Sequence, residues 1–275
     1  TVLDLALPFI SADLAPTSNQ LLWIIDVYSF VLAGLLITMG TLGDRVGRRN
    51  LLLIGAAGFG IASVVAAFST SPEMLIGARV LQGVSGATLM PATLGLIRTM
   101  FSDPRQRVMA IGIWGAMAGG GAAGGPLVGG WLLEHFWWGS VFLINIPVMI
   151  ALIGFGPLVI PESKDPFPGK FDLVSSALSM LALVPLVYAV KETVAHGMEP
   201  ATVLAAVVGI VSGVMFVRRQ RRLADPMIDL RLFANPAFST AVFTNFLSVF
   251  ALAGVLFFGA QYLQLVHGNS PLQAG

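Results

Sequence analysis

Three charged side chains lie inside long apolar runs of the sequence, where a charge is unfavourable. Asp4 and Asp26 are carboxylates, and Arg79 is a guanidinium. At about 1.5 Å of rise per helical residue, all three lie about 9–12 Å below the same face of a membrane. An unpaired charge at that depth costs several kcal/mol, so such residues are candidates for proton transfer or for binding charged substrates. We therefore expect Asp4, Asp26 and Arg79 to form one charged cluster.

This combination of side chains could exchange a proton for an organic cation. Burial favours the protonated form of a carboxylate, whereas a neighbouring guanidinium favours the ionised form. Trp23, Asp26 and Phe30 fall on one face of a helix by their spacing. Aromatic rings beside a carboxylate would suit an organic cation, although such a stripe also occurs in ordinary helix packing. The alternative for the charged cluster is a static ion pair that holds helices together.

The composition is that of a membrane protein with many spans. The chain is 56% hydrophobic and 11% charged, whereas soluble domains carry about 25% charged residues. About nine apolar runs are separated by short polar breaks: 1–12, 20–41, 51–70, 73–98, 107–133, 140–160, 172–192, 200–217 and 237–263. Because the chain begins at Thr1 within an apolar run and ends at Gly275 just after another, we expect it to be a fragment of a longer protein.

The sequence predicts no metal site and no cofactor. It contains no cysteine, which excludes disulfides and thiolate metal ligands, and its His, Asp and Glu residues have no metal-site spacing.

Basic residues predict the orientation of these spans. All but two of the 15 basic residues follow spans 2, 4, 6 and 8: Arg45, Arg48, Arg49, Arg98, Arg105, Arg107, Lys164, Lys170, Arg218, Arg219, Arg221, Arg222 and Arg231. Loops on the cytoplasmic side carry an excess of Lys and Arg, so these four loops are expected to be cytoplasmic. The same rule explains the run Arg218–Arg222 without nucleic-acid binding. Lys191, at an outer helix end, is expected to be solvated at the interface.

Two glycine-rich segments stand out between and within the spans. A short charged hinge, 40–49, is expected to form a tight hairpin in which Gly40, Gly43 and Gly47 allow the turn. The run 107–133 contains G-x-x-x-G spacings, among them Gly121 with Gly125 and Gly125 with Gly129, which let helices approach closely in lipid. Its Pro126 removes one backbone hydrogen bond and is expected to bend the helix.

In this order, the motifs resemble those of the major facilitator superfamily and, within it, the 14-helix drug:proton antiporter family. The hinge is similar to G-x-L-x-D-R-x-G-R-[RK], and 121–130 is similar to the family's antiporter motif. Asp4 departs from the family pattern, in which Asn is more frequent at that position. Further matching segments are Thr1–Pro8, Trp23–Tyr28, Arg79–Gly83, Asn145–Pro147 and Asp225–Phe233.

The resemblance implies an all-α major facilitator fold in three parts. Residues 1–160 would form the N-terminal six-helix bundle, 161–217 two additional central helices, and 218–275 a basic loop with the first helix of the second bundle. The implied site residues fall into four groups: Asp4, Asp26 and Arg79 for protons and substrate; Trp23, Phe30, Gln82 and Asn145 for the substrate cavity; Gly40, Gly43, Asp44, Arg45, Gly47, Arg48 and Arg49 for a cytoplasmic latch; and Gly121, Gly125, Pro126, Gly129 and Gly130 for the antiporter motif.

We therefore expect a secondary transporter, not an enzyme. It would export lipophilic, often cationic drugs or dyes across the bacterial cytoplasmic membrane by alternating access, as a monomer in the lipid bilayer. The proton gradient would supply the energy, with no cofactor. A transporter of the same fold for one metabolite or lipid is an alternative. An intramembrane aspartyl hydrolase using Asp4 and Asp26 would leave the hinge and the glycine motif unexplained, and a purely structural protein would have no use for the intramembrane charges.

Overall fold

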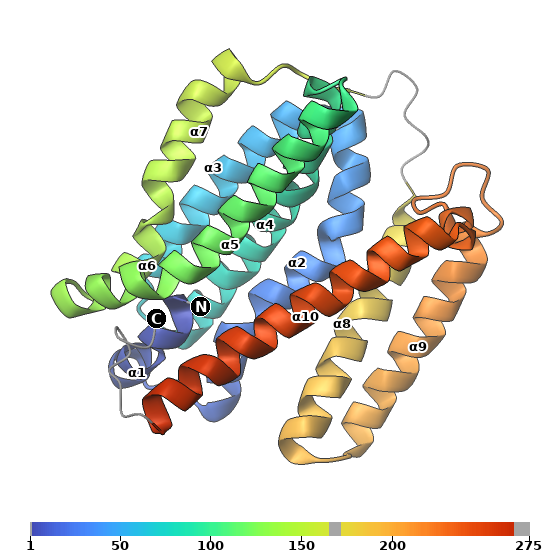
Figure 1. Ribbon diagram of the computed structural model, residues 1–275. Helices are drawn as coiled ribbons and strands as arrows, with labels where there is room; N and C mark the ends of the chain where they lie inside the picture. The colour runs from blue at the N-terminus through green and yellow to red at the C-terminus, as the bar shows by residue number, and fades with distance from the viewer. Residues whose placement is uncertain (1, 165–171, 267–275) are drawn as a thin grey trace.

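The computed structural model describes residues 2–164 and 172–266, which form helices and connecting loops without any strand (Figure 1). The elements are α1 Val2–Leu14, α2 Ser18–Val46, α3 Arg48–Ala67, α4 Pro72–Met100, α5 Pro104–His135, α6 Ser140–Leu143, α7 Asn145–Val159, α8 Leu173–His196, α9 Pro200–Gln220, the 3₁₀ helix η1 Leu230–Ala234, and α10 Pro236–Leu265. Among the described residues, seven helical stretches are long and apolar enough to cross a membrane. The chain is thus a multi-pass membrane protein.

Small residues let α2, α3 and α4 pack at close range. A Cβ atom on Gly83 of α4 would lie 2.9 Å from the carbonyl oxygen of Tyr28 on α2. A Cβ atom on Gly55 of α3 would collide with Thr88 of α4. Such contacts are how helices associate in lipid, where burial of apolar surface gives little driving force. These three helices therefore form a closely packed group that positions the side chains they carry.

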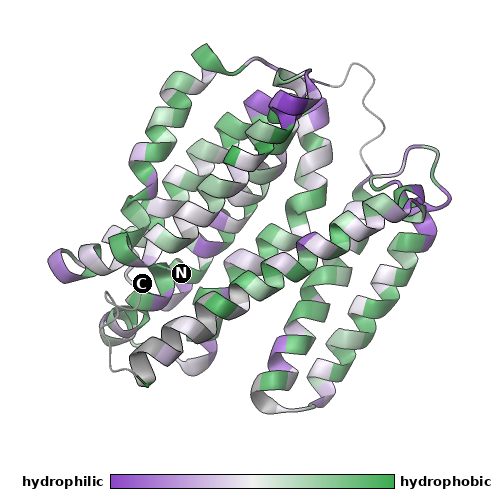
Figure 2. Ribbon diagram, in the orientation of Figure 1, coloured by the Kyte–Doolittle hydropathy of each residue, from purple (hydrophilic) through white to green (hydrophobic). Residues whose placement is uncertain are grey.

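The helices α8 and α9 form an antiparallel hairpin that lies beside α2 (Figure 1). A Cβ atom on Gly34 of α2 would lie 3.2 Å from Val184 Cγ2 on α8, and one on Gly209 of α9 would lie 3.0 Å from the backbone nitrogen of Leu186. Hydrophobic residues make up most of the helices, and hydrophilic residues gather mainly near the helix ends (Figure 2). The hairpin is thereby placed against the element that carries Asp26. The predicted division into three parts at 160 and 217 stays a prediction.

The hinge between α2 and α3 is shorter than expected, so the predicted loop over 40–49 is wrong. The helix α2 continues to Val46, and α3 begins at Arg48. Gly47 alone makes the turn, with a φ of 111° and its N–H donating to the carbonyl of Gly43. Gly40 and Gly43 lie inside α2 instead, where a Cβ atom on Gly43 would be 3.2 Å from Leu51 Cδ2. One residue with positive φ is enough to reverse the chain, because glycine adopts that conformation without steric cost.

The predicted span over 140–160 is helical but interrupted at Ile144, between α6 and α7. Pro147 explains the position of this break. Proline has no N–H, and its ring clashes with the carbonyl four residues earlier, which belongs to Leu143. The interruption places Asn145 at the first residue of α7, beside the cavity described below.

Candidate functional site

The charged residues predicted from the sequence line one cavity of about 470 Å³. Asp4 comes from α1, Asp26 from α2 and Arg79 from α4, and all three line this cavity together with Gln82 and Asn145. The Asp4 carboxylate acts electrostatically on the Arg79 guanidinium. The structure therefore brings together two carboxylates, one guanidinium and two amides from four separate helices. We call this space the central cavity.

Arg79 is held in place by backbone carbonyls of α2. Its Nε donates to the carbonyl of Ile24 at 3.1 Å, and its Nη2 to that of Ile25 at 3.5 Å. Its Nη1 donates to Oε1 of Gln82 at 3.0 Å, and its Cζ lies 4.5 Å from the centre of the Tyr28 ring. A planar guanidinium with five donors suits this many partners. The packing of α4 against α2 therefore sets the position of the Arg79 guanidinium relative to Asp26.

A buried serine connects Gln82 with Asn145. Ser63 of α3 is fully buried, and its Oγ accepts from Gln82 Nε2 at 2.9 Å and from Asn145 Nδ2 at 3.4 Å. The sequence interpretation missed Ser63, although a hydroxyl inside the apolar run 51–70 is a weak signal for such a role. Hydrogen bonds of this kind satisfy buried polar groups and fix their orientation. Gln82 is thus a buried link from Arg79 to α3, with only 1% of its surface exposed.

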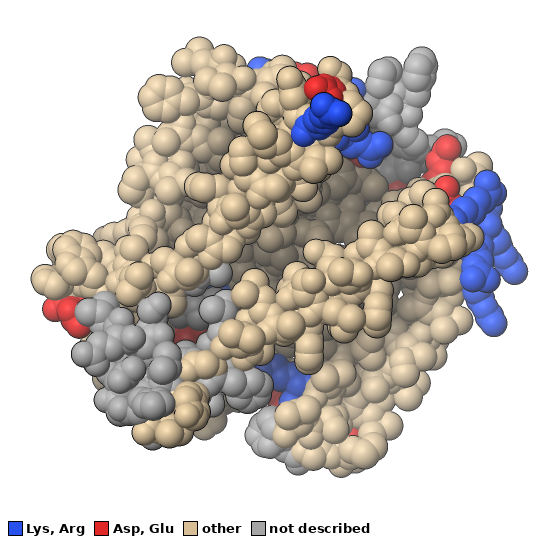
Figure 3. Space-filling view, in the orientation of Figure 1, with Lys and Arg blue, Asp and Glu red and all other residues tan. Residues whose placement is uncertain are grey.

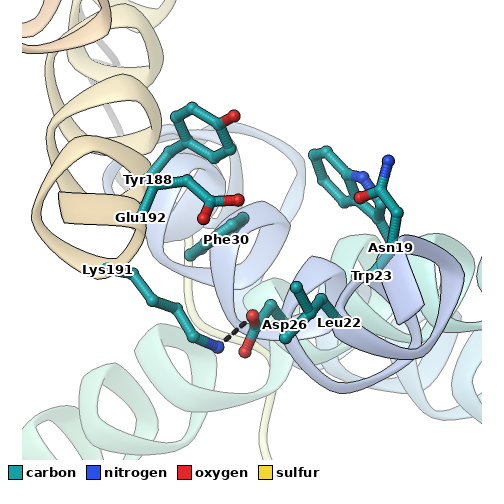
Figure 4. Close-up of a pocket in the computed structure, with 8 residues that line it drawn as sticks. All are labelled: Asn19, Leu22, Trp23, Asp26, Phe30, Tyr188, Lys191 and Glu192. Carbon is teal, nitrogen blue, oxygen red and sulfur yellow. Dashed lines mark hydrogen bonds and ion pairs between the residues drawn. The ribbon is translucent and has the colours of Figure 1, made fainter. Parts of the chain in front are cut away.

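Asp26 forms an ion pair with Lys191 of α8 (Figure 4). Lys191 is exposed, as expected, but its pairing with Asp26 was not predicted. Both residues line a second cavity of about 270 Å³ between α2 and α8, which we call the α2–α8 cleft. Its lining is Asn19, Leu22, Trp23, Asp26, Phe30, Tyr188, Lys191 and Glu192. Asp26 belongs to the linings of both cavities.

The aromatic residues predicted for the substrate cavity line the α2–α8 cleft. The rings of Trp23 and Phe30 are 6.3 Å apart in an edge-to-face arrangement, and both lie on the same side of α2 as Asp26 (Figure 4). Tyr188 and Glu192 face them from α8. The sequence suggested the α2 side of this cleft, but it gave no indication that α8 forms the other wall.

The hinge arginines contact groups of α2, of α4 and of the segment after α7. Arg48 Nη2 lies 2.7 Å from Asp44 Oδ1, and its Nη1 donates to the carbonyl of Gly95 on α4 at 3.1 Å. The backbone N–H of Arg49 donates to Glu162 Oε1 at 3.1 Å, after the end of α7. Gly95 and Glu162 were not predicted. A role of this cluster as a latch between bundles, including the exposed Arg45, stays a prediction.

The antiporter motif lies in α5, where part of it contacts α1. A Cβ atom on Gly125 would lie 3.2 Å from Val2 Cγ2, and one on Gly129 would collide with Val2. Gly121 has no described atom within 4 Å of such a Cβ position. Gly125 and Gly129 therefore permit close packing of α5 on α1. The proposed roles of Pro126 and Gly130 in this motif stay predictions.

Comparison with known proteins identifies the family. The sequence model of the Major Facilitator Superfamily matches residues 1–275. The chain belongs to this superfamily. Among the described residues, no group of three or more His, Asp or Glu side chains could hold a metal ion.

Curated relatives of this major facilitator protein have names that refer to drug export or resistance. The multidrug efflux pump LfrA of Mycolicibacterium smegmatis is 54% identical over all of this chain and 55% of its own length. The methyl viologen resistance protein SmvA of Salmonella typhimurium is 42% identical over all of this chain and 56% of its own length. The tetracenomycin C resistance and export protein of Streptomyces glaucescens is 37% identical, over 51% of its own length. The chain spans about half the length of these relatives.

Proposed function

We propose that the full-length protein exports lipophilic cations across the bacterial cytoplasmic membrane in exchange for protons. The observation that carries this proposal is the central cavity, in which Asp4 and Asp26 lie with Arg79. The names of the relatives support drug export. Membership of a transporter superfamily favours transport over the hydrolase alternative. The basic ends of the helices would face the cytoplasm.

Coupling would arise from competition for the carboxylates. A carboxylate in a membrane-embedded cavity is stabilised either by a proton or by a bound cation. Each partner therefore binds better when the other has left, which links the two fluxes thermodynamically. Protons moving inward down their gradient would drive the cation outward as the two bundles rock about the cavity. Arg79, fixed by α2 carbonyls, would set the local field that both partners experience.

Proton release from everted membrane vesicles tests this proposal. Vesicles containing the full-length protein are energised, their internal acidity is followed with a pH dye, and a lipophilic cation such as ethidium is added. We expect proton release with the unsubstituted protein and at least about tenfold less with Asp26→Asn, which corresponds to ~1.4 kcal/mol. Asp225→Asn removes an exposed carboxylate outside the cavities and serves as the matched control.

Two other outcomes are informative. If Asp26→Asn releases protons at the rate of the unsubstituted protein, Asp26 does not couple the fluxes. If several unrelated cations produce no response with the unsubstituted protein, the transporter of one specific metabolite or lipid replaces the multidrug proposal.

A further inference from the structure

The α2–α8 cleft has the composition expected for a site that binds an organic cation. Its walls carry two carboxylates, Asp26 and Glu192, and one ammonium group, Lys191. The aromatic side chains of Trp23, Phe30 and Tyr188 supply apolar surface. Cations are attracted to aromatic faces, and ligand sites combine apolar walls with a few placed polar groups. A volume of about 270 Å³ lies just below the range of about 300–1,000 Å³ that is usual for ligand pockets, which suits one compact ring system.

The two helices are held together next to this cleft. Gly34 of α2 allows Val184 and Met180 of α8 to approach closely, with Val184 Cγ2 at 3.2 Å from the position of a Cβ atom. Further along the same pair of helices, toward Phe30 and Tyr188, the cleft lies between them. The cleft is thus a defined space next to a fixed contact. Both α2 and α8 contribute side chains to its lining.

The two partners of the ion pair differ in their access to solvent. The side chain of Asp26 is 17% exposed, whereas that of Lys191 is 44% exposed. Lysine has a long flexible stem and a compact, strongly hydrated charge, so it can leave the pair for water at low cost. An ionised carboxylate on a membrane-spanning helix is stabilised by a positive partner. Lys191 can therefore be exchanged for another cation, while Asp26 remains in place.

We propose that Lys191 is an internal competitor of the transported cation for Asp26. In the absence of substrate, Lys191 pairs with the Asp26 carboxylate. An incoming organic cation takes its place beside Asp26, against the aromatic rings of the cleft, and Lys191 moves to water. This inference rests on the proposed function, and it assigns to the central helix α8 a role in substrate selection. The predicted division of the chain places α8 outside the N-terminal bundle, without such a role. A merely static pair would stabilise the fold but would not oppose cation binding.

Equilibrium binding separates these two roles. The full-length protein is purified into lipid nanodiscs, and ethidium binding is measured by fluorescence anisotropy at one pH, without any gradient. Lys191→Met keeps the length of the side chain and removes its charge. We expect it to lower the Kd for ethidium by about three- to tenfold, the range set by loss of one partly exposed ion pair. Lys191→Arg keeps the charge and is expected to bind ethidium within about twofold of the unsubstituted protein.

Three controls make the result specific. Lys164→Met applies the same substitution at an exposed lysine outside both cavities and should leave the Kd unchanged. An uncharged lipophilic dye, Nile red, should bind equally to the unsubstituted protein and to Lys191→Met. In an Asp26→Asn background, Lys191→Met should no longer strengthen ethidium binding. If Lys191→Met cannot be purified in folded form, Lys191→Gln takes its place.

The outcomes distinguish this inference from the proposed function. An unchanged or higher ethidium Kd in folded Lys191→Met overturns the inference, even where cation-driven proton release persists. An equal gain in Nile red binding also overturns it, because the effect would then be apolar. If the unsubstituted protein shows no cation-driven proton release but Lys191→Met lowers the Kd for ethidium as expected, antiport is overturned. Competition between Lys191 and the cation for Asp26 is then still supported. If the unsubstituted protein binds neither ethidium nor several unrelated lipophilic cations, both are overturned.

Discussion

At the scale of single residues, Gly47 shows how much can depend on one backbone conformation. Its φ of 111° lies in a region that residues with a side chain rarely adopt. A Cβ atom there would also lie 2.6 Å from Glu162 Oε1. Glu162 meanwhile accepts from the backbone N–H groups of Arg49 and Asn50 at the start of α3. Glycine is therefore required at position 47 for the positive φ of the turn and to leave space for the Glu162 carboxylate.

We expect Gly47→Ala to destabilise the full-length protein by about 1–3 kcal/mol, the usual cost of a strained backbone conformation. The midpoint of thermal unfolding in detergent measures this effect. Gly77→Ala is the matched control, because Gly77 lies within α4 and a Cβ atom there would have no described atom within 4 Å. Equal unfolding midpoints for the two variants would contradict the argument.

The sequence revealed the charged residues of the site but not all of their partners. Asp4, Asp26 and Arg79 were recognisable because a charge inside an apolar run has few structural explanations. Lys191 lies near a helix end, where a lysine can equally well reach water. What decides its partner is the packing of α8 against α2, which no local pattern specifies. Ser63 was missed for a similar reason, since its hydroxyl matters only through two amides on other helices.

At the scale of secondary structure elements, Asp172 connects the two helices of the α8–α9 hairpin. It precedes α8 and accepts from the backbone N–H groups of Val174 at 3.1 Å and Ser175 at 3.0 Å. Arg219 near the end of α9 binds both carboxylate oxygens, at 3.1 and 3.0 Å. Partial burial favours a higher pKa, but hydrogen bonds from Arg219 and Ser175 outweigh it and lower the pKa of Asp172 to about 2. The ionised carboxylate thus stabilises the folded hairpin.

This arrangement predicts how stability depends on pH. Because folding lowers the pKa of Asp172, its ionised carboxylate stabilises the folded state. This stabilisation is fully present above the ordinary pKa of 3.8 and is lost as the pH falls toward about 2. We expect Asp172→Asn to reduce stability by about 1 kcal/mol at pH 7, because the pair is partly exposed to solvent. The difference in unfolding midpoint should shrink between pH 4 and pH 3, within about two units of the lowered pKa.

The unfolding midpoints of the full-length protein and of the Asp172→Asn variant, measured at several pH values, provide the test. Asp225→Asn changes an exposed carboxylate in the loop after α9 and should have little effect at any pH. A difference for Asp172→Asn that is constant down to pH 3 would show that the charge of Asp172 is not responsible.

The positions of the helices could be predicted far better than their ends. Each of the nine apolar runs is mainly helical within the described residues, because a backbone in lipid must satisfy its own hydrogen bonds. The ends differ because loss of hydropathy does not end a helix: α2 continues through the charged residues Asp44 and Arg45. Hydropathy does not mark the break at Ile144. The break follows from Pro147, whose ring would clash with the carbonyl of Leu143 in a continuous helix. Local backbone chemistry, not composition, sets these boundaries.

At the scale of the whole molecule, the charges are distributed unevenly between the two ends of the helices. Positively charged residues gather near the α2–α3 turn and near the end of α9 (Figure 3). The two ends of α9 differ accordingly: Arg218 and Arg219 lie in its last turn, whereas Glu199 precedes its first residue. The excess of basic residues at one end predicts that this end stays on the cytoplasmic side during insertion.

Labelling at the two ends of α9 tests this orientation. The chain contains no cysteine, so Met198→Cys and Arg222→Cys introduce single reporters just before and just after α9, once any cysteines elsewhere in the full-length protein are replaced. Both positions are exposed in the structure. We expect a membrane-impermeant maleimide to label position 198 in intact cells and position 222 only after the membrane is permeabilised, because the arginines hold their end inside.

The reverse pattern would place the basic ends outside and would remove the electrostatic basis of the proposed direction of transport. Labelling of both positions in intact cells would mean that α9 does not cross the membrane, although its 21 apolar-rich residues are long enough to do so. The expected pattern would set Asp26, Lys191 and Arg79 nearer to the outer face. A cation that replaces Lys191 at Asp26 would then be nearer to the outer face than to the cytoplasm. As the bundles rock, the return of Lys191 or the arrival of a proton would favour its release to the outside.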